Sequence, residues 1–129
     1  MINTNNKRRV IIESPFAGSD HYTQAETIEY AKRAMNHSLN LDEAPIAFHL
    51  LYPAVLDDTS PIDRRLAMAA QFNWQSHAEI IAIYTDYGVS KGMRDAIDHY
   101  HNTSAKLANA PKIEWRMIGR NPEMKHDGD

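Results

Sequence analysis

The sequence predicts an α/β domain of three layers, with a mostly parallel four-stranded sheet and helices on both of its faces. Two observations predict it. Short runs rich in Ile and Val alternate along the chain with longer stretches of helical periodicity, in the order β-α-β-α-β-α-β. The short runs are apolar at consecutive positions, which is typical of strands buried on both faces of a parallel sheet. Such a sheet needs right-handed crossovers between its strands.

Four apolar runs are the candidate strands, at residues 10–12, 46–51, 80–84 and 113–118. Each is followed by turn-forming residues such as Ser14-Pro15 or Gly119. Edge strands often reverse direction, so the element order leaves open an antiparallel fourth strand.

Three helices are predicted between these strands, each from a start signal. Thr23 and Glu26 have the spacing of a capping box, which satisfies free N–H groups of the first turn. Ser60-Pro61 supplies an N-cap and a Pro at the first helical position, and Ser90 can cap the third helix. Apolar residues then recur near helical spacing: Ile28, Ala31, Met35 and Leu39, then Leu66, Ala69, Ala70 and Trp74, then Met93, Ile97 and Tyr100.

Length and composition narrow the class of protein. With 129 residues the chain suits one domain, taken as residues 8–119 with flexible tails at 1–7 and 120–129. The net charge is -3, whereas proteins that bind nucleic-acid polymers usually carry a basic surplus. There is no Cys, and the seven His lack ligand-like spacing, so we expect neither a metal site nor a cofactor. No apolar run approaches the ~18 residues of a membrane span, so we expect a cytoplasmic protein with no membrane partner.

Ligands of open α/β sheets bind beyond the carboxyl ends of the strands. The first segment at that edge runs from Glu13 to Gly18. There Ser14 can hydrogen-bond a ligand, and Phe16 can stack on a base. The alternative is a plain strand-to-helix turn with Phe16 in the core.

A second segment at the same edge, residues 86–93, joins a buried strand to a helix. Gly88 permits a tight turn, and Gly92 lets a ligand or a packed helix approach the first helical turn closely. Asp86 can bind a ribose hydroxyl, or it can accept N–H bonds within the loop.

Arginine matters here because its guanidinium holds phosphate in a bidentate manner. The candidates are Arg33, Arg64, Arg65, Arg94 and Arg116. Arg116 lies within an apolar strand, where a charge needs a partner, and we expect that partner to be Glu13, Asp86 or a ligand phosphate. His49, in the second predicted strand, is expected to be a core imidazole.

The strand that ends in Ser14-Pro15-Phe16, followed later by Asp86-x-Gly88-x-x-x-Gly92, resembles the nucleoside 2-deoxyribosyltransferase-like superfamily. In the enzymes of that superfamily the second motif typically runs Asp-x-Gly-Thr-x-x-Glu, and its Glu is the nucleophile. Gly92 stands at that Glu position in this chain, and Gly cannot act as a nucleophile. The resemblance therefore implies the fold and a nucleotide pocket without glycosyl transfer.

A narrower resemblance covers residues 8–119. Its motifs are the segment 10–18, Ala44-Pro45 with residues 49–52, residues 56–64, residues 84–93 and residues 112–116. In number, order and spacing they resemble the first type of Thoeris anti-defence protein. This resemblance implies a phage protein in the host bacterial cytoplasm. Such a protein binds cyclic ADP-ribose isomers made by host TIR-domain proteins and sequesters them without cleaving them, which blocks Thoeris immunity.

For the site, the resemblance and the residue chemistry together give a set of ligand-binding candidates: Ser14, Pro15, Phe16, Arg33, Asp86, Tyr87, Gly92, Met93 and Arg116. Arg33 and Arg116 are the candidates for the pyrophosphate, and Phe16 or Tyr87 for stacking on adenine. We also expect a homo-oligomer, dimer or hexamer, with the pocket near the protomer interface. The resemblance further implies that some members hold cyclic oligonucleotides at a second site.

Two other functions remain open from the sequence. One is an enzyme, a nucleoside 2-deoxyribosyltransferase or N-glycosidase that uses Asp86, Glu13 or Asp95. The other is a nucleotide-binding subunit of a larger complex.

Overall fold

The computed structural model describes residues 4–57, 59–104 and 110–119, and the expected tail residues 1–3 and 120–129 lie outside them. Its sheet has four parallel strands in the order β2-β1-β3-β4. The strands are β1 (Arg9–Glu13), β2 (Ala44–Ile46), β3 (Ile80–Tyr84) and β4 (Lys112–Arg116). The parallel sheet is thus confirmed, and the fourth strand runs parallel to the third.

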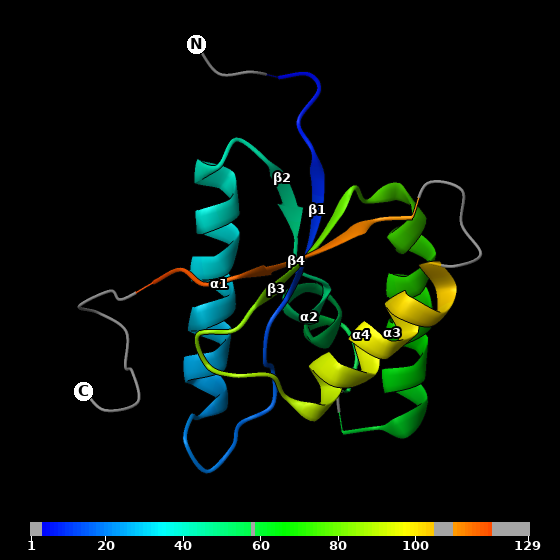
Figure 1. Cartoon of the computed structure of the whole chain (residues 1–129). Coiled ribbons are helices and arrows are strands. Elements are labelled where there is room, and N and C mark those ends of the chain that lie inside the picture. Colours follow the sequence, from blue (N-terminus) through cyan, green and yellow to red (C-terminus); the bar gives the residue numbers. More distant parts are fainter. Residues whose placement is uncertain (1–3, 58, 105–109, 120–129) are drawn as a thin grey trace.

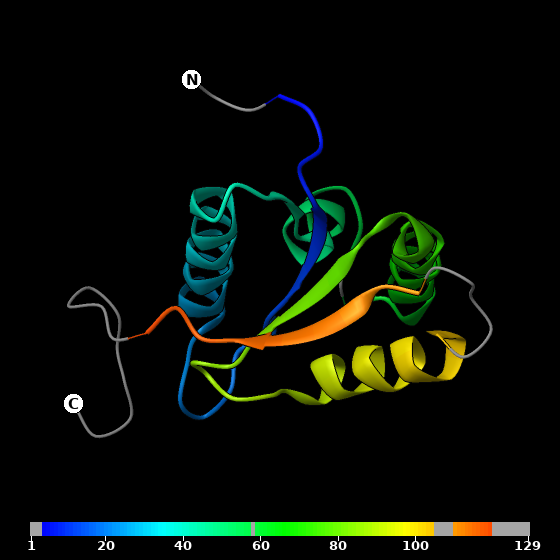
Figure 2. The same cartoon turned by 45° about the horizontal axis from the view of Figure 1, so that its top comes forward.

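Helices cover both faces of the sheet, as predicted (Figures 1 and 2). One face carries α1 (Gln24–Asn40), whose Tyr30 and Ala34 pack on Val10 and Ile12 of β1. The other carries α4 (Lys91–Ser104), whose Met93, Ile97 and Tyr100 pack against Ile11, Ile81 and Ile83, and α3 (Pro61–Trp74) lies on this side too. The apolar side chains of β1 and β3 therefore alternate between two cores.

The three helix starts form as the sequence predicts. Thr23 makes both hydrogen bonds of the capping box with Glu26. Ser60 accepts a hydrogen bond from the Asp63 N–H ahead of α3. Ser90 accepts one from the Met93 N–H at the start of α4.

The predicted second strand at 46–51 is wrong. Strand β2 ends at Ile46, and after Ala47 the chain forms the short helix α2 (Phe48–Leu51) and the 3₁₀ turn η1 (Tyr52–Ala54). Short apolar runs suit a strand or a buried helical turn equally well. Here the helical turn is favoured because it buries Phe48 in the core that contains Ile11 and Met93. A second 3₁₀ turn, η2 (Gln75–His77), follows α3.

Along the described ranges of the chain, none of the helices has the length and apolar character needed to span a bilayer.

Candidate functional site

A cavity of about 580 Å³ lies at the carboxyl end of β1, beside the start of α4. Its wall comes from the loop after β1, from α2 and η1, from one face of α3 and from the first turns of α4. This volume lies within the usual range of small-molecule sites. The edge is the one that the parallel sheet predicts, since ligands of such folds bind beyond the strand ends. Four aromatic rings line the cavity: Phe16, Phe48, Tyr52 and Phe72.

Glu13, the last residue of β1, lies in the cavity wall although its side chain is almost entirely buried. Its Oε1 accepts hydrogen bonds from Tyr100 Oη at 2.7 Å and from Gln71 Nε2 at 2.6 Å. Burial raises the pKa of Glu13 to about 7, although those two hydrogen bonds act against the rise. Glu13 is therefore a carboxyl group that exchanges its proton near neutral pH.

Ser14 and His49 form a polar pair in the same wall. Ser14 Oγ lies 2.7 Å from His49 Nε2, and Ser14 is buried. Burial lowers the pKa of His49 to about 4, so the imidazole is neutral at pH 7. The sequence predicted a core imidazole within a strand, whereas His49 lies half-buried on α2 in the cavity wall, hydrogen-bonded to Ser14. This pair offers neutral hydrogen-bonding groups to a ligand.

Cationic side chains reach the cavity from two helices. Lys91 Nζ, at the start of α4, is paired with Asp95 at 3.0 Å. Arg64, in the first half of α3, forms no ion pair or side-chain hydrogen bond with the described residues. Arg64 is thus the guanidinium most available to an anion in this cavity. It lies near the N-terminal end of α3, where the helix dipole also favours negative charge.

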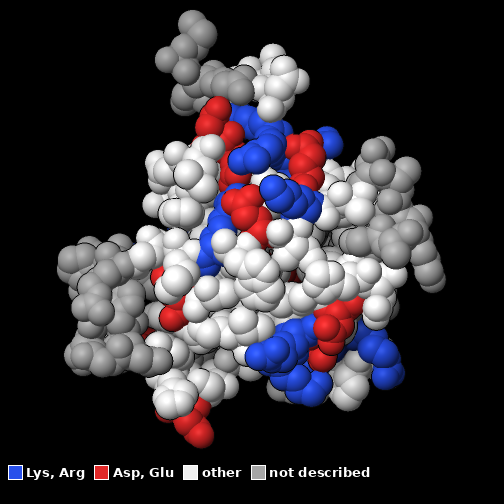
Figure 3. Space-filling model, in the orientation of Figure 1, with Lys and Arg blue, Asp and Glu red and all other residues white. Residues whose placement is uncertain are grey.

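Carboxylates also reach the cavity, from the loop before α3 and from α3 itself. Asp57 accepts hydrogen bonds from the backbone N–H and the hydroxyl of Thr59, and these lower its pKa. Asp63 Oδ2 accepts a hydrogen bond from the Asp57 N–H at 2.8 Å. Both side chains therefore hold this loop in shape. On the face seen in Figure 3, Lys and Arg likewise lie beside Asp and Glu rather than in one basic patch.

At the start of α4, Gly92 lies in the cavity wall and leaves open space. A Cβ atom added to it would meet nothing closer than Ser90 Oγ at 4.0 Å. Close helix packing is therefore not what requires glycine here. The neighbouring Gly88 differs, because its φ of +82° is the left-handed conformation that favours glycine.

The structure brings together four of the predicted ligand-binding residues. Ser14, Phe16, Gly92 and Met93 all line the cavity, whereas Pro15 between them does not. Met93 is also part of the buried core, so the cavity reaches that core at this point.

Asp86 lies outside the cavity and is fully engaged by its own loop. Its carboxylate accepts hydrogen bonds from Tyr30 Oη at 2.5 Å, from Ile118 N–H at 2.9 Å and from Gly119 N–H at 3.1 Å. Of the two roles that the sequence left open, the structure shows acceptance of loop N–H groups. Asp86 thereby ties the turn after β3 to the chain that follows β4.

Tyr87 and Arg33 also lie away from the cavity, on the α1 side. The Tyr87 ring is stacked between Tyr22, at 3.8 Å between centroids, and Tyr30, at 4.3 Å. Arg33 Nε lies 3.9 Å from Glu29 Oε1 on the same helix. Neither residue lines the cavity, so the predicted contacts of Arg33 with a pyrophosphate and of Tyr87 with adenine do not agree with their positions.

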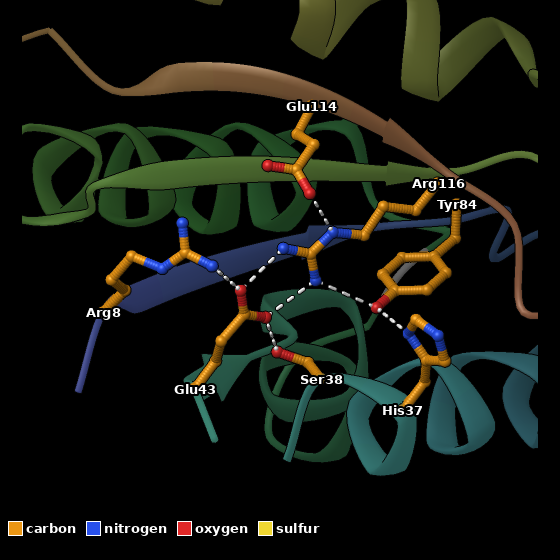
Figure 4. A network of polar contacts seen from close by, with 7 residues as sticks. All are labelled: Arg8, His37, Ser38, Glu43, Tyr84, Glu114 and Arg116. Carbon is orange, nitrogen blue, oxygen red and sulfur yellow. Dashed lines mark hydrogen bonds and ion pairs between the residues drawn. The ribbon is translucent and has the colours of Figure 1, made fainter. Parts of the chain in front are cut away.

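Arg116 has a partner, as a charge in an apolar strand requires, but that partner is neither Glu13 nor Asp86. Its Nη1 and Nη2 donate to the two oxygens of Glu43 at 2.7 and 2.8 Å, and its Nε donates to Glu114 (Figure 4). Burial alone would lower the pKa of Arg116, but these hydrogen bonds raise it overall. The guanidinium faces α1 and is not in the cavity wall. A phosphate-binding role for Arg116 at this cavity is thus excluded by position.

Several residues of the cavity wall are not among the predicted ligand-binding residues. Arg64, Ala67, Met68 and Gln71 recur at helical spacing along α3 and share the face toward the cavity. That spacing was visible in the sequence, but only the fold shows which face of the helix meets the ligand edge. Lys91 and Asp95 likewise follow from the position of α4.

Among the described residues, no group of three or more His, Cys, Asp or Glu side chains is placed to hold a metal ion.

A family model described as a domain of unknown function (DUF7768) matches residues 8–110. Comparison with curated proteins and with solved structures gives no significant match.

Proposed function

The chain belongs to the family described as a domain of unknown function (DUF7768), and from its cavity we propose that it is a non-catalytic nucleotide binder. Its resemblance to Thoeris anti-defence proteins of the first type narrows the ligand to a cyclic ADP-ribose isomer. In this proposal a phage protein in the host cytoplasm holds the signal of TIR-domain proteins without cleaving it. Thoeris immunity is then blocked.

One observation carries the proposal. The cavity combines aromatic walls with Arg64, which has no ion-pair partner among the residues that the structure describes, beside the N-terminal ends of α3 and α4. Phe16 offers flat apolar surface to a base, and Arg64 offers a bidentate donor to a pyrophosphate. One face of the Phe72 ring is already stacked on His99. Ser14 and His49 add neutral hydrogen-bonding groups that suit ribose hydroxyls. The three parts of a nucleotide thus each meet a matching chemistry within one cavity.

The absence of cleavage is supported by Gly92. The resembled enzymes carry their nucleophilic Glu at this position, and here the cavity wall has open space instead. Binding alone must then lower the free signal, which requires tight association. A Kd near 1 nM corresponds to about -12 kcal/mol.

A second candidate, an N-glycosidase-like enzyme, is favoured by Glu13. This buried carboxyl in the cavity wall has a pKa of about 7, which suits general acid–base catalysis near neutral pH. Asp95 also lines the cavity, whereas Asp86 does not. The enzyme alternative therefore depends on Glu13 and Asp95.

One experiment separates the two candidates. The protein is incubated with a cyclic ADP-ribose isomer, freed of unbound ligand, heated to denature it, and the released material is analysed by chromatography. A non-catalytic binder releases intact ligand in amounts that match the protein, and so should the control variant Glu79→Gln, whose side chain is exposed and outside the cavity. Linear ADP-ribose or free base in the released material would support the enzyme instead.

The expected homo-oligomer is part of the proposal. On α3, Met68 lines the cavity and is 41% exposed, whereas the more exposed Ile62 (64%) and Leu66 (58%) lie on the opposite side of the helix. A second copy that covers Met68 would lie next to the cavity mouth. Light scattering should give a dimer or hexamer mass, and a strict monomer with ligand bound would contradict the shared pocket.

A further inference from the structure

The two carboxyl oxygens of Glu13 have different surroundings. Oε1 accepts both the Tyr100 hydroxyl and the Gln71 amide. Among the described residues, Oε2 has no hydrogen-bond partner. Every fully buried side-chain oxygen among those residues does have a partner, so Oε2 is not fully buried. Oε2 therefore reaches a surface, and because Glu13 lines the cavity, that surface is the cavity wall.

This asymmetry is the one that a protonated carboxyl group requires. A carboxylate accepts hydrogen bonds on both oxygens, whereas a carboxylic acid accepts on its carbonyl oxygen and donates from its hydroxyl. The protein supplies two donors to Oε1 and leaves Oε2 to the cavity. Burial, which raises the pKa of Glu13 to about 7, favours the same neutral form.

We propose that Glu13 contacts the bound ligand as a neutral acid. Its Oε2 hydroxyl then donates a hydrogen bond to an acceptor oxygen or nitrogen of an anionic ligand. The inference rests on the proposed function, in which that ligand is a nucleotide. A charged carboxylate in the cavity wall would repel the phosphate, so ligand binding takes up a proton at Glu13. Affinity for the anion therefore falls as the pH rises through neutrality.

Other titratable groups face Glu13 or share its cavity: Tyr100, Lys91 and Asp95 from α4, Asp63 and Arg64 from α3, His49 from α2 and Asp57 from the loop before α3. Burial raises the pKa of Tyr100, so its hydroxyl remains a donor. His49 stays neutral above its pKa of about 4. Neither group changes its charge between pH 6 and pH 8, where Glu13 does.

The test is calorimetric titration of a cyclic ADP-ribose isomer into the full chain between pH 6 and pH 8, in two buffers of different ionisation enthalpy. The affinity of the unmodified protein should fall about tenfold over this interval, with uptake of up to one proton. Glu13→Gln keeps a donor toward the cavity and should bind with no such pH dependence. Glu79→Gln, at an exposed carboxylate outside the cavity wall, is the matched control and should keep the pH profile of the unmodified protein. Identical pH profiles for the unmodified protein and Glu13→Gln would overturn the inference.

A second measurement keeps this inference separate from the identity of the ligand. Carbon-13 NMR of the Glu13 carboxyl should show a titration midpoint near pH 7, which rises when inorganic pyrophosphate is added. A midpoint near the ordinary value of about 4.5, or one that pyrophosphate leaves unchanged, would overturn the inference. If the midpoint rises but no cyclic ADP-ribose isomer binds at any pH, the proposed function fails and the inference for anions stands.

Discussion

Arg116 and Glu43 form a bidentate ion pair in which both side chains are almost completely excluded from solvent, at 5% and 1% exposure. Glu43 immediately precedes β2 and Arg116 ends β4, so the pair spans the α1 face between the two edge strands (Figure 4). Ser38, Tyr84, Arg8 and Glu114 make the other hydrogen bonds of this pair. The most deeply buried arginine of the sheet thus holds the fold together, away from the cavity.

Arg116→Ala should lower the free energy of unfolding by about 3–5 kcal/mol, because it leaves the Glu43 carboxylate buried without its main partner. Arg8→Ala removes the exposed partner of the same carboxylate and should cost at most about 1 kcal/mol. Urea denaturation measures both losses. Equal losses for the two variants would contradict the structural role of Arg116, as would loss of ligand binding by the folded Arg116→Ala protein.

Gly92 and Gly88 make a matched pair for glycine substitutions. Gly92→Ala should leave the fold intact or stabilise it by up to about 1 kcal/mol, since a Cβ has space there and Ala suits a helix. Ligand affinity should fall at the same time, because the new methyl group enters the cavity wall. Gly88→Ala should instead destabilise the fold by about 1 kcal/mol through its positive φ. Unchanged affinity in Gly92→Ala would show that the ligand does not approach the start of α4.

The raised pKa of Glu13 predicts a loss of stability with rising pH. Its neutral form is the one that the fold buries, so its contribution is complete below about pH 4.5 and is lost as the pH rises through about 7. Across that interval the loss is of the order of 3 kcal/mol. Denaturation at pH 5 and pH 8 should therefore show that Glu13→Gln gains stability relative to the unmodified protein at the higher pH. A difference that does not change with pH would contradict the burial of a titrating Glu13.

The lowered pKa of His49 predicts that the protein also loses stability as the pH falls. Its folded-state pKa of about 4 lies below the ordinary 6.5, so its contribution is complete above about pH 6.5 and is lost as the pH falls through about 4. The expected loss is again of the order of 3 kcal/mol. His49→Gln should flatten the stability profile between pH 6.5 and pH 4. An unaltered acid limb in that variant would show that the imidazole is not buried in its neutral form.

The sequence predicted the features that local interactions decide. Thr23, Ser60 and Ser90 mark the helix starts because a cap involves residues only a few positions apart. The parallel sheet followed from runs that are apolar on both faces. The short α2 was missed because an apolar run of that length does not by itself distinguish a strand from a helical turn.

Pairings between distant residues could not be predicted in the same way. A buried Arg116 requires an acidic partner, but the chain has 17 acidic residues. Only the fold shows that this partner is Glu43, which lies 73 positions away in the sequence. The sequence predicted that Tyr87 could stack on a base, but in the fold its ring is stacked between Tyr22 and Tyr30. That Arg64 lines the cavity could not be predicted, because this depends on how α3 packs beside the carboxyl ends of the strands.

The most direct test of the nucleotide-binding proposal is the affinity of a cyclic ADP-ribose isomer for Arg64→Ala and Arg65→Ala, measured by calorimetry at pH 6.5. Both arginines are exposed, but Arg64 lines the cavity and has no partner among the described side chains, whereas its neighbour Arg65 does not line the cavity. Arg64→Ala should bind at least tenfold more weakly, since a charge-assisted hydrogen bond contributes about 1.5–3 kcal/mol, and Arg65→Ala should bind as the unmodified protein does. Equal affinities for the two variants would contradict the nucleotide-binding proposal.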